Sequence, residues 1–137
     1  MKAFVLYAVL GGVVIPSPST AAGKSASASV CHVIRDAREL IGERVQVDGY
    51  VQDLGSHGFV LTGMRRNCAG ILVLQIQALA SNRSWWKAFG DSVGPKRATL
   101  VGTVRWVKPR YDNGRNPALK VERVLYLSSE EANPKDF

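Results

Sequence analysis

Residues 44–52 read Arg-Val-Gln-Val-Asp-Gly-Tyr-Val-Gln, a run in which apolar and polar side chains alternate. Successive side chains of a β-strand point to opposite faces, so Val45, Val47, Gly49 and Val51 share one face. The pattern predicts a half-buried strand with a glycine inside it. Glycine weakens a strand interior, so its presence there calls for a structural reason.

Four further segments have the composition of strands: 59–62, 70–77, 97–107 and 118–127. The run 97–107 repeats the first pattern, because Ala98, Leu100, Gly102, Val104 and Trp106 point one way. Turn and loop residues at 53–58, 63–69 and 108–117 separate the strands.

Two segments break the β pattern. Residues 30–41 carry apolar side chains at helical spacing and end at Gly42, which predicts a short amphipathic helix. Within 78–93, we expect Ser84 to cap a helix that Gly90 ends. Trp85 and Phe89 share a face of that helix. Adjacent helical residues point about 100° apart, so we expect at most one of Trp85 and Trp86 to be exposed.

The order of three strands, a helix and two strands resembles OB-fold domains over about residues 44–127. The motifs that carry the likeness are Val45-x-Val47-x-Gly49-x-Val51 and Leu100-x-Gly102-x-Val104. The chain is most similar to small exported bacterial OB-fold proteins. The resemblance implies an all-β fold, a five-stranded OB-type β-barrel with a short helix between strands 3 and 4 and an N-terminal helical segment. An immunoglobulin-like sandwich is the alternative, disfavoured by the few strands and the central helix.

The N-terminus has the pattern of a secretory signal peptide over residues 1–22. Lys2 precedes an apolar run from Ala3 to Ile15, and small residues follow. Cleavage after Ala22 fits best and cleavage after Ala28 is the second option, while a buried N-terminal strand or helix is the alternative. The run is too short to span a membrane. We reject a lipid anchor because Ser29-Val30 is a poor match to the required small residues.

The expected organisation is therefore a signal peptide (1–22), a flexible leader (23–29), the OB-fold domain (30–127) and a polar tail (128–137). The mature chain would be periplasmic or secreted and has no second apolar run of membrane-spanning length; its oligomeric state is open.

In an oxidising compartment the two cysteines, Cys31 and Cys68, predict a disulfide. Two free buried thiols are the alternative. Zinc would need more ligands than the cysteines and His32 supply.

The formal charge of +7 favours polyanions such as nucleic acid, anionic lipid headgroups or acidic polysaccharide, although a basic protein without such a ligand fits equally well. OB folds bind ligands between two loops, here 53–58 and 108–117. Cations that neutralise phosphates and rings that stack on bases form single-strand sites. The candidate ligand-binding residues are Lys108, Arg110, Tyr111, Arg115, Tyr50, Arg65 and Arg66. The alternative is a solvated loop with Tyr111 packed on the barrel rim.

No catalytic constellation is evident in the sequence. His32 and His57 lie in no catalytic or metal-binding motif, and Asp48 and Asp53 fall on opposite strand faces. We therefore expect a non-catalytic binding module without cofactor or metal, for single-stranded nucleic acid or another polyanionic oligomer. The rival hypothesis is a structural or protein-interaction domain of the bacterial cell envelope.

Overall fold

The computed structural model describes residues 27–63, 68, 70–90, 94–108, 114–133 and 135 of the chain. The elements of these residues, in chain order, are β1 (Ser27–Ser29), α1 (Val30–Arg35), α2 (Ala37–Leu40), β2 (Arg44–Asp53), the 3-10 turn η1 (Gly55–His57), β3 (Phe59–Thr62), β4 (Ile71–Gln75), the 3-10 turn η2 (Gln77–Leu79), α3 (Arg83–Gly90), β5 (Lys96–Val107) and β6 (Asn116–Leu127).

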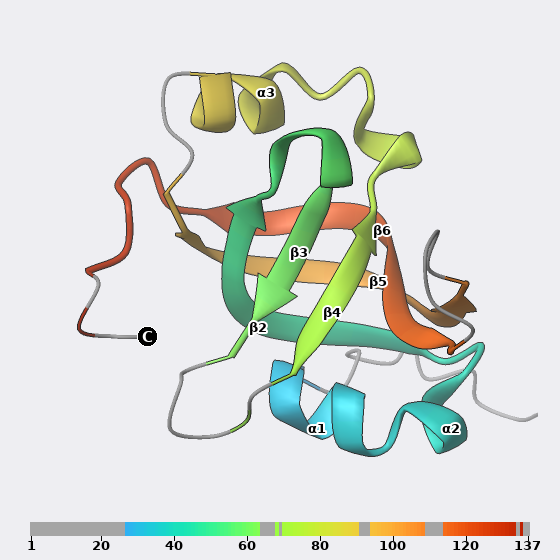
Figure 1. Ribbon diagram of the computed structural model, residues 1–137. Coiled ribbons are helices and arrows are strands. Elements are labelled where there is room, and N and C mark those ends of the chain that lie inside the picture. Colours follow the sequence, from blue (N-terminus) through green and yellow to red (C-terminus); the bar gives the residue numbers. More distant parts are fainter. Residues whose placement is uncertain are drawn as a thin grey trace, which may run out of the picture.

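Five of the described strands close into a barrel (Figure 1). The order around it is β2, β3, β4, β6 and β5, and β5 pairs back onto β2. β4 and β6 run parallel, whereas the other barrel neighbours are antiparallel. With α3 between β4 and β5, this is the OB-type all-β barrel, as the alternation of the sequence predicts.

β2 is shared between the two halves of the barrel. Arg44–Val51 pairs with β5, and Tyr50–Asp53 pairs with β3, so the strand must curve from one sheet direction into the other (Figure 1). A Cβ atom at Gly49 would lie 2.6 Å from Val30 Cγ2 and 2.9 Å from Leu61 Cγ. The glycine is thus required by the close packing of α1 and β3 against this strand.

Gly102 has a similar role on β5, where it pairs with Val121. A Cβ atom there would collide with the backbone carbonyl of Lys120. We expect Gly102→Ala to lower the free energy of unfolding by about 1–3 kcal/mol, because β6 would have to move. Urea denaturation measures this. Gly90→Ala is the control, since its Cβ would meet no described atom within 4 Å, and an equal loss there would contradict the packing explanation.

Helical segments pack at both ends of the barrel (Figure 1). At one end α1 buries Val30 and Val33 completely. At the other end α3 buries Trp85 and Phe89, whose ring centroids lie 5.2 Å and 5.1 Å from that of Phe59. Trp85 is 1% exposed and Trp86 is 46% exposed, so the prediction that at most one of these two residues is exposed is confirmed.

The predicted cap of α3 is wrong by two residues. The side chain of Asn82, not Ser84, accepts a hydrogen bond from the backbone N–H of Trp85 at 3.0 Å. An Asn side chain satisfies the otherwise unpaired N–H groups of a first helical turn as well as Ser does. Because Ser84 lies inside the helix, its hydroxyl is not used as a cap.

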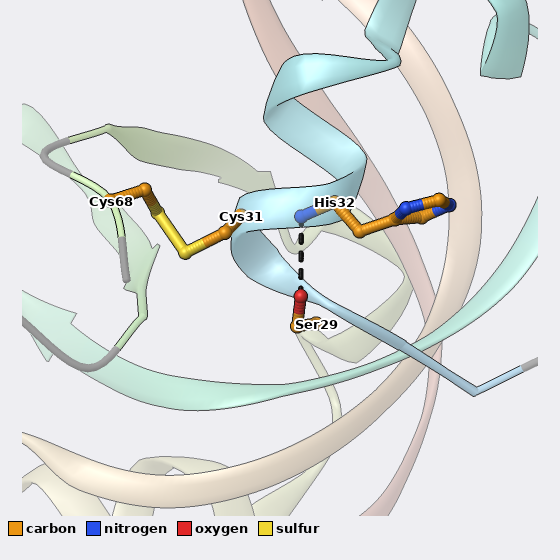
Figure 2. Close-up of a disulfide and its surroundings, with 4 residues drawn as sticks. All are labelled: Ser29, Cys31, His32 and Cys68. Atoms are coloured by element: carbon orange, nitrogen blue, oxygen red, sulfur yellow. Dashed lines mark hydrogen bonds between the residues drawn. A yellow bond between two sulfur atoms is a disulfide. The ribbon is translucent and has the colours of Figure 1, made fainter. Parts of the chain in front are cut away.

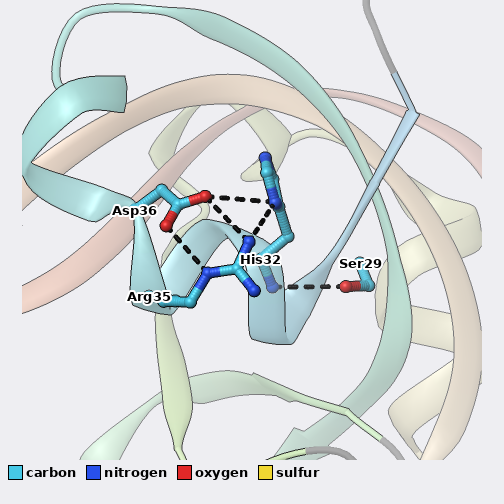
Figure 3. Close-up of polar contacts among 4 residues, drawn as sticks. All are labelled: Ser29, His32, Arg35 and Asp36. Carbon is cyan, nitrogen blue, oxygen red and sulfur yellow. Dashed lines mark hydrogen bonds and ion pairs between the residues drawn. The ribbon is translucent and has the colours of Figure 1, made fainter.

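The helical segment predicted over 30–41 is divided at Asp36 into α1 and α2. Ser29 caps α1 by accepting a hydrogen bond from the His32 N–H at 3.2 Å. The Asp36 carboxylate accepts bonds from the Arg35 guanidinium at 2.9 Å and 3.0 Å and lies 3.2 Å from His32 Nδ1 (Figure 3). These bonds from Arg35 lower the pKa of Asp36 below its ordinary value.

The flexible leader predicted over 23–29 needs correction at its last three residues. They form β1, which pairs in parallel with Gln46–Asp48 of β2. The Ser27 hydroxyl donates to Asp48 at 3.0 Å, and Thr99 Oγ1 donates to the same carboxylate at 2.5 Å. Serine and alanine gave no strand signal because β1 is held by backbone pairing and small polar contacts.

The Cys31–Cys68 disulfide is confirmed (Figure 2). Its Cα atoms lie 5.5 Å apart, within the ordinary range for a disulfide. The bond connects α1 to the segment between β3 and β4. It therefore fastens the α1 end of the barrel to residues far along the chain.

The predicted polar tail continues along the barrel as far as it is described. The Ser128 N–H donates to the Arg97 carbonyl at 2.8 Å, and the Ala132 N–H donates to the Pro95 carbonyl at 2.7 Å. Residues 128–132 thus run beside the beginning of β5. No helix of the described residues is long and apolar enough to cross a membrane.

Glu122 joins three strands of the barrel. It accepts hydrogen bonds from Thr103 on β5 at 2.8 Å and from Arg44 on β2 at 2.7 Å. These bonds lower the pKa of Glu122 below its ordinary value. A carboxyl whose pKa is lower in the folded state stabilises the fold above its unfolded pKa of about 4.3, and this contribution is lost as the pH falls through the folded pKa.

We therefore expect Glu122→Gln to be less stable than the wild type by up to about 1 kcal/mol at pH 7, since the pair is partly exposed. At pH 3 the difference should shrink. Urea denaturation at both pH values measures it, and a difference that does not change with pH would contradict the assignment.

Candidate functional site

Two arginines and a tryptophan lie close together at the α2 end of the barrel. Arg38, Trp106 and Arg115 line an open hollow of about 490 Å³, here called the Trp106 pocket. Trp106 is half-buried and both arginines are exposed. A flat ring beside two planar cations presents a surface for stacking and for anion neutralisation.

Strand pairing sets this arrangement. Trp106 pairs with Pro117 near the start of β6, which brings Arg115 beside the end of β5. α2 is attached to the same strand by the loop that follows it, because the Gly42 N–H donates to the Val104 carbonyl at 2.9 Å and the Val104 N–H donates to the Glu43 carbonyl at 3.0 Å. Three separate segments thus bring Arg38, Trp106 and Arg115 together.

The arginines of this pocket form no ion pair with a carboxylate of the described residues. Among the described residues, no ion pair holds Arg38, Arg115 or Lys108, and Lys108 is also exposed at the end of β5. By contrast, Arg35 and Arg44 are both engaged with carboxylates. Within the described part of the chain, the exposed cations at the α2 end thus differ from Arg35 and Arg44 in having no carboxylate partner.

The structure brings together only some of the residues that the sequence singles out. Lys108 and Arg115 lie opposite each other, just beyond the paired residues Val107 and Asn116. Tyr50 is elsewhere, because it pairs with Arg97 at the other end of β5. The remaining candidates lie outside the described residues: Arg65, Arg66, Arg110 and Tyr111.

Tyr50 borders a separate hollow of about 250 Å³ beside the disulfide. Asp48, Arg97 and Cys31 are among the other residues that line it. The presence of the Asp48 carboxylate makes the charge of this hollow mixed. Tyr50 and the Trp106 pocket therefore do not form one continuous basic surface along β5.

Sequence reasoning missed Arg38 and Trp106 as candidate site residues. Trp106 follows the inward alternation of β5 and was expected on the apolar face, while Arg38 was expected on a helix without a known position relative to the barrel. Trp106 is the last inward position before the strand ends, and this is the signal that could have identified it as a rim residue.

The described residues contain no group of three or more His, Cys, Asp or Glu side chains that could hold a metal ion. His32 is bound to Asp36, and His57 is exposed in η1. Asp53 accepts a hydrogen bond from the Gly55 N–H at 2.8 Å and so stabilises that turn.

Comparison with known proteins identifies no relative: no family model, no curated protein and no solved structure matches the chain. The assignment to the OB type follows from strand order and pairing alone. One fold can carry many functions, so function has to be argued from the chemistry of the surface.

Proposed function

We propose that this protein is a non-catalytic module that binds polyanionic oligomers through the Trp106 pocket, with single-stranded nucleic acid as the leading ligand. The observation that carries the proposal is that Trp106 lines one hollow with two arginines that have no carboxylate partner among the described residues. Guanidinium groups bind phosphates, and an indole ring stacks on bases of any sequence.

Two general features support this function. The net charge of +7 draws polyanions toward the protein. The loop between β5 and β6, beside which the pocket lies, corresponds to one of the loops that frame ligands in OB folds. We further propose that the protein works in an exported, oxidising compartment, which the Cys31–Cys68 disulfide supports.

Fluorescence polarisation with a labelled single-stranded DNA oligonucleotide at several salt concentrations tests the proposal. Log affinity should fall against log salt with a slope of about −0.7 for each phosphate neutralised. Arg38→Ala/Arg115→Ala should flatten the slope by roughly one unit. Lys120→Ala/Arg123→Ala, which removes two exposed cations from β6, is the charge-matched control and should change the slope less.

Trp106→Leu should weaken binding by about 1–3 kcal/mol with little change of slope, because stacking involves no counterion release. Thermal denaturation of each variant verifies that the barrel is folded. Equal effects of the Arg38→Ala/Arg115→Ala and Lys120→Ala/Arg123→Ala variants would move the site away from this pocket. No binding at low salt to any nucleic acid or acidic glycan would favour the rival, an interaction domain of the cell envelope.

A further inference from the structure

Lys96 is the one charged residue that is buried among the described residues. It opens β5, and only 3% of its surface is exposed. Its Nζ donates a hydrogen bond to the Ser129 carbonyl at 2.9 Å. An ammonium carries three donors, and a buried charge is costly unless it is paired. Within the described part of the chain, no carboxylate forms an ion pair with Lys96.

This lysine borders a hollow of about 480 Å³ between α3 and the end of β6, here called the Lys96 pocket. Its lining residues are Ser84, Lys87, Ala88, Lys96, Leu127, Ser128 and Ser129. Two of them carry positive charge and none is acidic. Ser128 uses its hydroxyl to donate to the Glu130 carbonyl, whereas no hydrogen bond to a described residue engages the Ser84 hydroxyl.

Glu131 is an acidic side chain close in the chain to the lining residues Ser128 and Ser129, and it does not line the pocket. The Glu131 carboxylate lies against Gly94, where it would touch an added Cβ atom, and it pairs with neither lysine. The pocket is also distinct from the Trp106 pocket, because α3 and α2 lie at opposite ends of the barrel (Figure 1).

We propose that the Lys96 pocket is a binding site for a small amphiphilic anion. The oxyanion head, a phosphate or a carboxylate, accepts hydrogen bonds from the ammonium groups of Lys96 and Lys87 and from the Ser84 hydroxyl. A short apolar body lies against Ala88 and Leu127. The head group supplies a counter-charge that no described carboxylate gives the buried lysine in an ion pair, and a neutral ligand of the same shape does not supply it.

The test compares three probes by isothermal titration calorimetry and by thermal denaturation: hexyl phosphate, hexanoate and hexanol. Hexyl phosphate or hexanoate should bind and raise the melting temperature by on the order of 10 °C at a hundredfold excess over Kd. Hexanol should bind at least tenfold more weakly. The stronger of the two anions identifies the head group.

Lys96→Met is the decisive variant, because it replaces the charge with an apolar chain of similar length. It should lower the affinity for the anion at least tenfold, and Lys87→Met should lower it several-fold. Lys120→Met, on the outer face of β6, has the same change of net charge and should leave the affinity unchanged.

The stability of Lys96→Met separates this proposal from a purely structural role. Without anion, the variant should melt at or above the temperature of the wild type, because it removes a buried charge that no described carboxylate pairs with. With hexyl phosphate or hexanoate at saturation, the order should reverse. If Lys96 only fastens residue 129 to the barrel, Lys96→Met melts lower with or without anion, and that result would overturn the proposal. Equal affinity of the wild type and the Lys87→Met and Lys96→Met variants, or no binding of either anion, would overturn it as well.

Discussion

Trp85→Ala should lower the free energy of unfolding by about 3–5 kcal/mol, the usual cost of truncating a buried tryptophan. The indole packs against both Phe59 and Phe89 at the α3 end of the barrel, with centroid distances of 5.2 Å and 5.1 Å. α3 has only eight residues, and helices of this length depend on tertiary packing rather than on intrinsic stability. Loss of the ring should therefore loosen the whole helix.

Urea denaturation, followed by far-UV circular dichroism, measures this effect. Trp86→Ala is the matched control on the same helix, because Trp86 is exposed and should cost less than about 1 kcal/mol. Trp85→Phe keeps an aromatic ring and removes the indole N–H, which has no described acceptor. It should be markedly milder than the alanine variant, and similar losses for Trp85→Ala and Trp86→Ala would contradict the assigned roles.

Removal of the disulfide should have an effect of similar size. The Cys31–Cys68 bond closes a loop with a sequence separation of 37, which corresponds to about 4 kcal/mol on the chain-entropy estimate. α1 is short and joins the barrel mainly through Val30 and Val33, so it has few contacts with which to replace the covalent link. We expect Cys31→Ser/Cys68→Ser to lose about 4 kcal/mol in urea denaturation.

Reduction provides an independent measurement. A reductant should destabilise the wild type by the same amount and leave the double serine variant unchanged. Thiol titration of the denatured, unreduced protein should detect no free thiol. If reduction left the urea midpoint of the wild type unaltered, the bond would contribute nothing to the stability of the fold.

Alternation in the sequence was sufficient to predict β2, where Val45, Val47 and Val51 are buried as expected. One face of this strand is buried and the other is more exposed, so its period of two is visible in the sequence. The predicted strand 59–62 coincides with β3, although Phe59, Val60 and Leu61 are all buried and show no such period. β1 is a three-residue strand without a buried residue, so periodicity could not predict it.

The candidate sites depend on contacts between distant segments, and for this reason the sequence predicted them only in part. Lys108 and Arg115 are close in the chain and flank one loop. Trp106 meets Arg38 only after α2 has docked on β5, and Lys96 becomes buried only when residues 128–129 pass over it. When a remote segment buries a charged residue, the sequence around that residue shows no pattern that would indicate the burial.

β3 pairs with β2 only over Tyr50–Asp53, and β1 pairs with β2 over Gln46–Asp48. β1 therefore covers a part of β2 that β3 leaves unpaired. An uncovered strand edge offers unpaired N–H and C=O groups to any other extended chain. If the signal peptide that the sequence predicts is cleaved after Ala22, Ser27–Ser29 stays in place, whereas cleavage after Ala28 would remove two of the three residues that pair with Gln46–Asp48. Under that prediction, the cleavage position decides whether this edge of β2 is covered or open to pairing by a foreign strand.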